Sequence, residues 1–170
     1  MKAKLYFILL AISSLLFSCD DKFEGQIVRD NKPEIPVTFD GATTVGFNPY
    51  YTVAYSTGTG AITISLSIPQ NAKLKIKQVE NVIAGATSIN VASITSPSQP
   101  QYLTSPVAVN GTTFTLNSSI TEFNTKVTSG NRITAAPAAG AFTERAFMIR
   151  LRMDDDSFII PVQCRIRVTP

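Results

Sequence analysis

The chain of 170 residues contains no histidine and no tryptophan, and it has only two cysteines. Histidine is the commonest general base and a frequent zinc ligand, so its absence excludes Ser-His-Asp and Cys-His catalysis and histidine-bound zinc. A Gly-rich phosphate-binding loop is also missing, because Gly58-Thr59-Gly60 is an isolated turn with no helix predicted after it. We therefore expect a protein that is not an enzyme and that uses no cofactor and no metal.

The first residues have the pattern of a secretory signal peptide. Lys2 and Lys4 precede an apolar run over residues 5–17. The run is shorter than the roughly 20 residues that a membrane-spanning helix needs, and no basic cluster follows it. We therefore expect residues 1–18 to be a signal peptide that is not part of the folded domain.

The segment Leu16-Phe17-Ser18-Cys19 resembles the lipobox of bacterial lipoproteins. In that family the cysteine is diacylated and the peptide bond before it is cut. The resemblance implies that Cys19 is the lipid-attachment residue and that the N-terminal lipid joins the protein to a membrane. Two or three acyl chains anchor a protein stably, whereas one binds marginally. The alternative is an ordinary secretory signal that contains a cysteine.

Residues 19–34 are predicted to form a polar tether between the lipid and the domain. Their acidic start, Asp20-Asp21 with Glu24, resembles the surface-export signal of lipoproteins from the Bacteroidota. That resemblance implies an outer-membrane location, with display on the cell surface; a solvated tether is the alternative. With Cys19 acylated, Cys164 has no partner for a disulfide, and we expect a buried, inert thiol.

Charge of either sign is scarce, because Asp, Glu, Lys and Arg together make up 16% of the chain. Removal of residues 1–18 takes Lys2 and Lys4 away, which leaves 13 of the 15 basic residues against 12 acidic ones. Nucleic-acid binding requires a pronounced basic surface. Nucleic acid is therefore not an expected partner.

From residue 35 onward, apolar and polar residues alternate with the period of a β-strand. Ile62, Ile64, Leu66 and Ile68 alternate with small polar residues. Tyr51, Val53 and Tyr55 alternate in the same way and are expected to face the core. Asn110-Gly111 predicts a two-residue hairpin turn that pairs Val107 with Phe114.

The last third of the sequence predicts a second hairpin. Its first strand has an apolar face formed by Phe147, Ile149, Leu151 and Met153, and its second has one formed by Phe158, Ile160, Val162, Cys164, Ile166 and Val168. A turn centred on Asp155-Asp156 would pair Met153 with Phe158, Leu151 with Ile160 and Ile149 with Val162. The same register places Glu144 opposite Arg167.

These patterns together predict an all-β fold. Ser119-Ile120-Thr121-Glu122 has the spacing of a capping box and predicts one short helical turn. Residues 95–106 and 128–143 are expected to be loops. We expect a single domain over residues 35–170, an antiparallel β-sandwich of immunoglobulin-like type.

The candidate ligand-binding residues are four arginines, predicted to point away from the core, and one tyrosine: Arg150, Arg152, Arg165, Arg167 and Tyr102. Arginine suits the oxyanions of acidic glycans and lipopolysaccharide phosphates; a solvated outer face is the alternative. If any aromatic side chain is exposed for sugar stacking, Tyr50 and Tyr102 are the better candidates. Asp154-Asp155-Asp156 lacks the alternating spacing of a calcium loop and is expected to be a solvated hairpin tip.

Several segments also resemble a group of small Bacteroidota lipoproteins without an established activity. The resembling segments are the lipobox, YYTVAYSTGTGAITISLSIP, SITEFNTK and AFMIRLRMDDDSFIIPVQCRIRV. The resemblance implies an accessory role in outer-membrane glycan uptake or in adhesion, with a glycan or an envelope protein as partner. The alternative is a carbohydrate hydrolase that uses two carboxylates about 5–10 Å apart. Its candidates are Asp40, Glu80, Glu122 and Glu144.

Overall fold

The computed structural model describes residues 35–44, 48–56 and 59–170. The expected signal peptide, the lipid-attachment residue Cys19 and the tether over 19–34 lie outside these residues. Within the described ranges, none of the helices combines the length and the apolar character needed to cross a bilayer.

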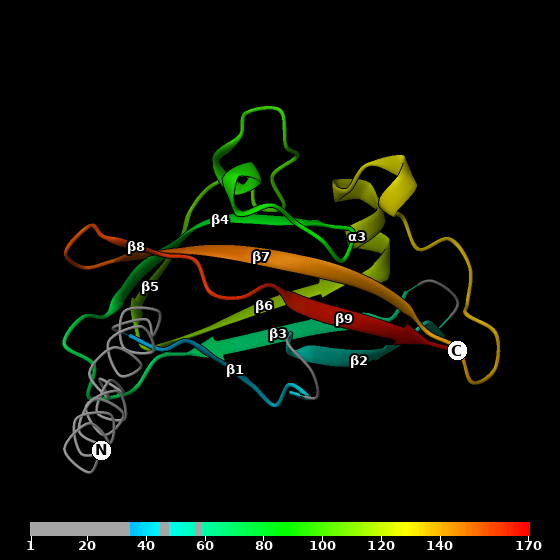
Figure 1. The fold of residues 1–170 in the computed structure, drawn as a ribbon, viewed down its shortest axis with the longest axis horizontal. Helices are drawn as coiled ribbons and strands as arrows, with labels where there is room; N and C mark the ends of the chain where they lie inside the picture. The colour runs from blue at the N-terminus through cyan, green and yellow to red at the C-terminus, as the bar shows by residue number, and fades with distance from the viewer. Residues whose placement is uncertain (1–34, 45–47, 57–58) are drawn as a thin grey trace, which may run out of the picture. The chain divides into compact units, whose positions relative to one another are not determined.

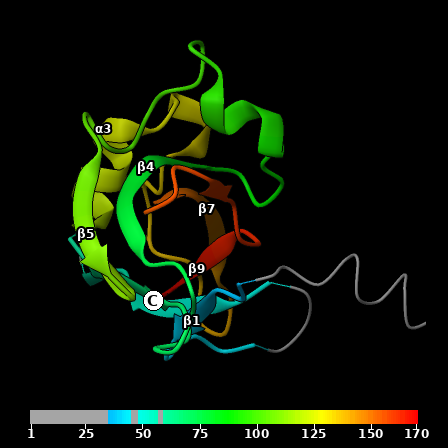
Figure 2. The ribbon, with the colours of Figure 1, turned by 90° about the vertical axis from the view of Figure 1, so that its left-hand side faces the viewer.

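Strands dominate the fold, and the predicted all-β class with a short helix is confirmed (Figure 1). A three-stranded sheet has the order β1-β3-β6, and a six-stranded sheet has the order β2-β9-β7-β4-β5 with β8 also paired to β7. The strands are β1 (Thr38–Asp40), β2 (Tyr50–Ala54), β3 (Ala61–Ser67), β4 (Ile76–Gly85), β5 (Val107–Gly111), β6 (Thr113–Ser119), β7 (Thr143–Met153), β8 (Phe158–Ile159) and β9 (Cys164–Thr169). The helices are η3 (Val91–Thr95), α3 (Ile120–Lys126) and η4 (Ser129–Asn131). Figure 2 shows how the six-stranded sheet curves from β5 through β4 and β7 to β9.

One strand pair departs from the expected antiparallel pattern. β2 runs parallel to β9, with Tyr50 opposite Arg165 and Val53 opposite Val168. A parallel pair needs a crossover connection rather than a tight turn. Here nearly the whole domain separates the two strands, so no local sequence signal marks their pairing.

The alternation in β3 produces the inner face of the smaller sheet. Ile62, Ile64, Leu66 and Ile68 are each at most 3% exposed. Residues on the opposite face are small and polar, and Ser65 Oγ lies 3.0 Å from Thr115 Oγ1 on β6. The predicted alternation of buried and solvent-facing residues in this strand is confirmed.

In β4 the buried residues recur every three positions instead of every two. Ile76, Val79 and Val82 are buried, and the register with β7 shifts between Ile76 and Gln78 and again between Val79 and Asn81. Each bulge inserts one extra residue, which turns the next apolar side chain back toward the core. The bulges explain why apolar residues do not alternate with period two along this strand.

The hairpin predicted at Asn110-Gly111 is wrong. Asn110 has the positive φ of 49° that such a turn favours, but β5 pairs with β4, and β6 pairs with β3 along its whole length. The chain therefore passes from one sheet to the other at this point. Burial of Leu116 against Ile64 in the core decides the pairing of β6 over the local turn signal.

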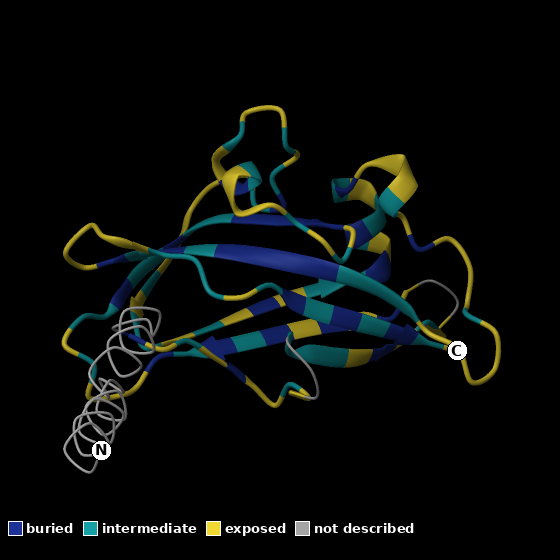
Figure 3. Ribbon diagram, viewed as in Figure 1, coloured by how far each residue is buried: buried dark blue, intermediate teal, exposed yellow. Residues whose placement is uncertain are grey.

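The C-terminal hairpin is confirmed in part. Phe147, Ile149, Leu151 and Met153 on β7 are fully buried, and Glu144 pairs with Arg167 as predicted. Figure 3 shows the middle of the β7 ribbon in the colour of buried residues. Near the tip, however, the predicted register is wrong by one residue, because Leu151 lies opposite Ile159.

A three-residue loop at the tip causes this shift. Asp156 adopts a φ of +65°, and the Met153 amide donates to the Ser157 carbonyl at 2.9 Å, as in three-residue hairpin loops with a left-handed third position. Phe158 and Val162 consequently have exposed fractions of 43% and 58% instead of facing the core. The non-strand segment around Pro161 then restores the predicted register at Cys164.

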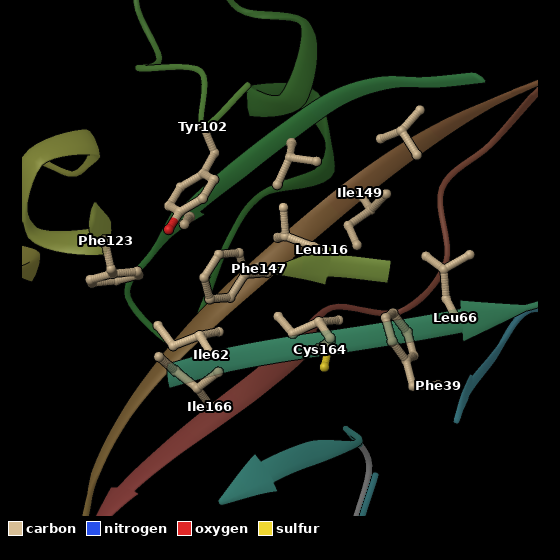
Figure 4. Close-up of a cluster of buried hydrophobic side chains, with 14 of the residues drawn as sticks. Phe39, Ile62, Leu66, Tyr102, Leu116, Phe123, Phe147, Ile149, Cys164 and Ile166 are labelled. Carbon is tan, nitrogen blue, oxygen red and sulfur yellow. The ribbon is translucent and has the colours of Figure 1, made fainter. Parts of the chain in front are cut away.

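The short helix α3 begins where the capping box predicts. Ser119 is its N-cap, and Ser119 Oγ accepts a hydrogen bond from the Glu122 amide at 3.1 Å. Phe123 packs from α3 into the core, with its ring centroid 5.6 Å from that of Phe147 (Figure 4).

Tyr102, one of the two candidates for an exposed aromatic and for ligand binding, lies in the core instead. Tyr102 is 1% exposed, and its ring packs edge-on against Phe147 with centroids 5.1 Å apart (Figure 4). The Tyr102 amide donates to the Val82 carbonyl at 2.7 Å, which draws the predicted loop back onto β4. Its hydroxyl is hydrogen-bonded to Ser118, so the ring is buried with its polar atom satisfied.

Candidate binding face

The four candidate arginines project from the outer face of the six-stranded sheet. On β7, Arg150 and Arg152 alternate with the buried Ile149, Leu151 and Met153. On β9, Arg165 and Arg167 alternate with buried Cys164, Ile166 and Val168 in the same way. Successive side chains of a strand point to opposite faces, so the predicted outward direction of all four is confirmed.

A crossing loop, residues 86–101 with η3, divides this face into two ends. Met148 also projects outward from β7, but it is buried in a small cluster with Ile83 and Ile94. Arg165 pairs with Ala146, four residues along β7 from Arg150. At about 3.3 Å per residue, Ala146, which lies opposite Arg165, is about 13 Å from Arg150 along the backbone of β7. The arginines therefore form two separate pairs and not one continuous ladder.

The first pair belongs to what we call the Glu144 end: Tyr50, Phe142, Glu144, Arg165 and Arg167. Glu144 Oε1 accepts hydrogen bonds from Arg167 Nε at 3.1 Å and Nη2 at 2.8 Å, and Arg165 Nη1 lies 3.3 Å from Oε2. The Arg167 guanidinium lies between two rings, 3.9 Å from the Tyr50 centroid and 4.1 Å from that of Phe142. Glu144 thus already occupies the two arginines at this end.

Arg165 also forms a hydrogen bond with the crossing loop. Its Nη2 donates to the Thr87 carbonyl at 3.3 Å, and Gln163 Nε2 donates to the same oxygen. Gln163 Oε1 in turn accepts from the Ile89 amide at 3.3 Å. These contacts give Arg165 a structural role beside its ion pair.

The second pair belongs to what we call the Arg150 end: Lys77, Asn81, Arg150, Arg152, Asp156 and Phe158. Asp156 Oδ1 lies 2.7 Å from Lys77 Nζ and 3.0 Å from Arg152 Nε. The hydrogen bond from Lys77, followed by the charge of Arg152, lowers the pKa of the Asp156 carboxyl. Asp156 therefore stays ionised beside these two cations and partly neutralises them.

Arg150 lacks such a carboxylate. Its guanidinium carbon lies 3.6 Å from the centroid of the Phe158 ring, and Nη1 has one long contact of 3.4 Å to Asn81 Oδ1. Within the described part of the chain, Arg150 forms no salt bridge. The other three candidate arginines, Arg152, Arg165 and Arg167, each pair with a carboxylate.

Amide side chains flank the Arg150 end. Asn81 lies opposite Arg150, and Gln78 lies opposite Arg152 across the β4–β7 pair. Asn81 Nδ2 donates to Gln101 Oε1 at 3.2 Å, and Gln101 comes from the crossing loop. Amides offer both donors and acceptors, so this end can bind hydroxyl groups as well as an anion.

Sequence reasoning missed the two exposed aromatic rings of this face. Phe142 and Phe158 have exposed fractions of 50% and 43%. Alternation assigned Phe158 to the core, and Phe142 lies just before β7 in a segment expected to be a loop. The run Asp154-Asp155-Asp156 is the sequence signal that could have predicted the exposure of Phe158. If these three residues form the whole loop, the register of the following strand shifts by one residue, and Phe158 moves to the outer face.

The candidate hydrolytic carboxylates lie on four different elements. Asp40 is on β1 and accepts from Ser67 Oγ at 2.7 Å, Glu80 is on β4 and accepts from Gln78 at 2.5 Å, and Glu122 is on α3 and pairs with Lys126 at 2.6 Å. Glu144 is the acceptor for Arg165 and Arg167. A search of the described residues finds no group of three His, Cys, Asp or Glu side chains that could hold a metal.

The hairpin tip with its three aspartates is exposed to solvent. Asp155 Oδ1 accepts from the Ser157 amide at 2.9 Å, and hydrogen bonds from Ser157 lower the pKa of the Asp155 carboxyl. Asp154 Oδ2 accepts from the Lys75 amide at 3.2 Å. Each carboxylate thus has its own protein partner, and the three have no common ligand position.

The outer face of the six-stranded sheet therefore carries a stacked arginine at each end, and the two differ in whether a carboxylate completes them. No model of a known protein family matches the chain, and no curated protein matches it. What this face binds has to be inferred from its own chemistry.

Proposed function

We propose that the protein is a non-enzymatic, lipid-anchored module of the cell envelope that binds anionic glycans with the outer face of its six-stranded sheet. The observation that carries the proposal is the pairing of exposed Phe142 and Phe158 rings with Arg167 and Arg150, 4.1 and 3.6 Å from the ring centroids. Large apolar side chains exposed beside cations on a rigid sheet are typical of a recognition surface.

The anchor is inferred from Leu16-Phe17-Ser18-Cys19, which resembles a lipobox. Acylated Cys19, followed by the acidic residues Asp20 and Asp21, would hold the domain at the outer membrane, on the cell surface. A glycan-binding domain in that position suits an accessory of glycan uptake or an adhesion protein. An immunoglobulin-like sandwich, as the sequence patterns predict, would fit the same role, since such scaffolds commonly present binding surfaces.

A binding role is favoured over hydrolysis by the placement of the acidic residues. Glycosidases hold two carboxylates on either side of the scissile bond, whereas Asp40, Glu80 and Glu122 each bind a different side chain, Ser67, Gln78 and Lys126. Glu144 in addition accepts hydrogen bonds from Arg165 and Arg167, so both of its oxygens already have protein partners.

Two measurements on the full chain test the proposal. Cells grown with labelled palmitate should label the wild-type protein and not Cys19→Ala. The purified chain should bind polygalacturonate or lipopolysaccharide, both anionic, more tightly than neutral dextran, and the difference should shrink as salt is added. Equal affinity for the neutral and the anionic polymers would contradict glycan recognition by this face, and an unlabelled wild-type protein would contradict the anchor.

A further inference from the structure

The two ends of the outer face contain the same structural unit, complete at one end and incomplete at the other. At the Glu144 end, the Arg167 guanidinium is stacked between Tyr50 and Phe142 and binds a carboxylate. At the Arg150 end, the Arg150 guanidinium is stacked on Phe158 at 3.6 Å. The second unit has one ring instead of two, and Arg150 forms none of the salt bridges found among the described residues.

Stacking orients an arginine without using its hydrogen-bond donors. The ring contacts the flat face of the guanidinium, while the five N–H donors lie in its plane. Arg167 uses this arrangement to donate from Nε and Nη2 to Glu144. In Arg150 one donor makes a 3.4 Å contact to Asn81, so the remaining N–H groups are held in position for a planar anion.

We infer that Arg150 binds the carboxylate of a uronic-acid residue in a bound acidic glycan, in the way that Arg167 binds Glu144. The inference rests on the proposed glycan-binding function and names its ligand group and its site. The ordered guanidinium lowers the entropy lost on binding, because fewer side-chain rotamers have to be fixed.

The neighbours of Arg150 favour a sugar acid over other anions. Asn81 lies opposite Arg150 and is hydrogen-bonded to Gln101, while Gln78 lies opposite Arg152 and donates to Glu80. The remaining donors and acceptors of these amides can hydrogen-bond to sugar hydroxyls next to the carboxylate. Asp156, which faces Arg152 on the same end, repels a doubly charged phosphate more than a singly charged carboxylate. The exposed edge of Phe158 adds an apolar contact for the sugar ring.

The test is the affinity of the full chain for polygalacturonate, measured by isothermal titration calorimetry with wild type, Arg150→Gln and Lys73→Gln. Lys73 is exposed, lies before β4 and is not one of the residues of the Arg150 end, so its variant removes the same charge without changing a residue of that end. Arg150→Gln should weaken binding roughly tenfold or more, since it removes a charged, two-point hydrogen bond. Lys73→Gln should stay within about twofold of wild type.

Two further variants separate charge from geometry. Arg150→Lys keeps the charge but loses the planar donor pair, and it should bind several-fold more weakly than wild type. Phe158→Leu keeps every charge but removes the stacking ring, and it should also weaken binding several-fold. Urea unfolding midpoints equal to that of wild type establish that each variant is folded.

The outcomes distinguish this inference from the proposed function. If wild type binds polygalacturonate and Arg150→Gln binds as tightly as Lys73→Gln, the Arg150 site is overturned while glycan binding stands. Binding to lipopolysaccharide but not to polygalacturonate would likewise overturn the uronic acid as the ligand group and leave the function. Poly-glutamate bound as tightly as the sugar polymer would show that the occupant is an acidic peptide. Binding to none of the anionic glycans would remove the proposed function itself.

Discussion

Glu144 and Arg167 face each other across the β7–β9 pair, and one carboxylate oxygen of Glu144 accepts two hydrogen bonds from the guanidinium. The side chains of Glu144 and Arg167 are 18% and 29% exposed, so solvent screens the interaction only in part. The pair links the C-terminal strand to β7 at the centre of the sheet, and Glu144 partly neutralises the two arginines at this end of the binding face.

Removal of the Glu144 charge should therefore destabilise the domain. Glu144→Gln leaves Arg165 and Arg167 without their shared anion, and the free energy of unfolding should fall by about 1–3 kcal/mol. Urea denaturation measures this loss. Glu80→Gln is the matched control, since Glu80 forms none of the salt bridges found among the described residues. Equal stability of the two variants would contradict a structural role for the ion pair.

The shifted register of β8 can be tested with two residues that alternation placed on the same face. Ile149 is 1% exposed, whereas Val162 is 58% exposed. Ile149→Ala should lower the free energy of unfolding by about 2–5 kcal/mol, and Val162→Ala should change it by less than about 0.5 kcal/mol. Comparable losses from both substitutions in urea unfolding would mean that Val162 packs in the core after all.

The N-cap of α3 gives a smaller, local effect. Ser119→Ala removes the acceptor of the Glu122 amide and should cost about 1 kcal/mol of stability, which thermal unfolding detects as a lower Tm. Ser119→Asp keeps an acceptor and should retain most of that stability. A Tm for Ser119→Ala equal to that of wild type would argue against the cap.

The sequence was most informative where a pattern is local and the strand is half buried. The alternation at Ile62, Ile64 and Leu66 and the capping box at Ser119 both depend on neighbouring residues alone, and both predictions are confirmed. Two features that depend on residues distant in the sequence could not be predicted from local patterns. They are the parallel pairing of β2 with β9 and the passage of the chain from one sheet to the other after Asn110.

The binding face was predictable in direction but not in arrangement. The alternation of apolar and polar residues correctly predicted that Arg150 and Arg167 point away from the core. The crossing loop separates the Arg150 end from the Glu144 end, because Ile94 of the loop packs in one cluster with Met148 of β7. No local sequence pattern indicates that contact. Tyr102 illustrates the same limit, because its burial follows from the packing of Phe123 and Phe147.

Two tyrosines should make the stability sensitive to alkaline pH. Burial raises the pKa of Tyr51 and of Tyr102 from 10.0 to about 12. The unfolded chain releases these protons near pH 10, while the folded domain retains them, so the free energy of unfolding should fall as the pH rises from about 10 to about 12. Urea midpoints across that range measure the slope.

Tyr51→Phe provides the internal comparison for this pH dependence. Phenylalanine has no proton to lose, so the variant should show a shallower decline than wild type in the same range. The substitution also removes the hydroxyl that lies 2.7 Å from the Asp40 carbonyl, which should lower stability at neutral pH. An unchanged slope would contradict the raised pKa of Tyr51.

The most direct test of acidic-sugar binding at the outer face is an NMR titration of the full chain with a short oligogalacturonate, which follows the Nε–H resonances of the four arginines. Arg150 should shift progressively and saturate, because a carboxylate reaches its free donors. Arg167 should stay unchanged, because Glu144 already occupies its donors. Saturating shifts at Arg167 with none at Arg150, or no shifts on this face at all, would contradict the account.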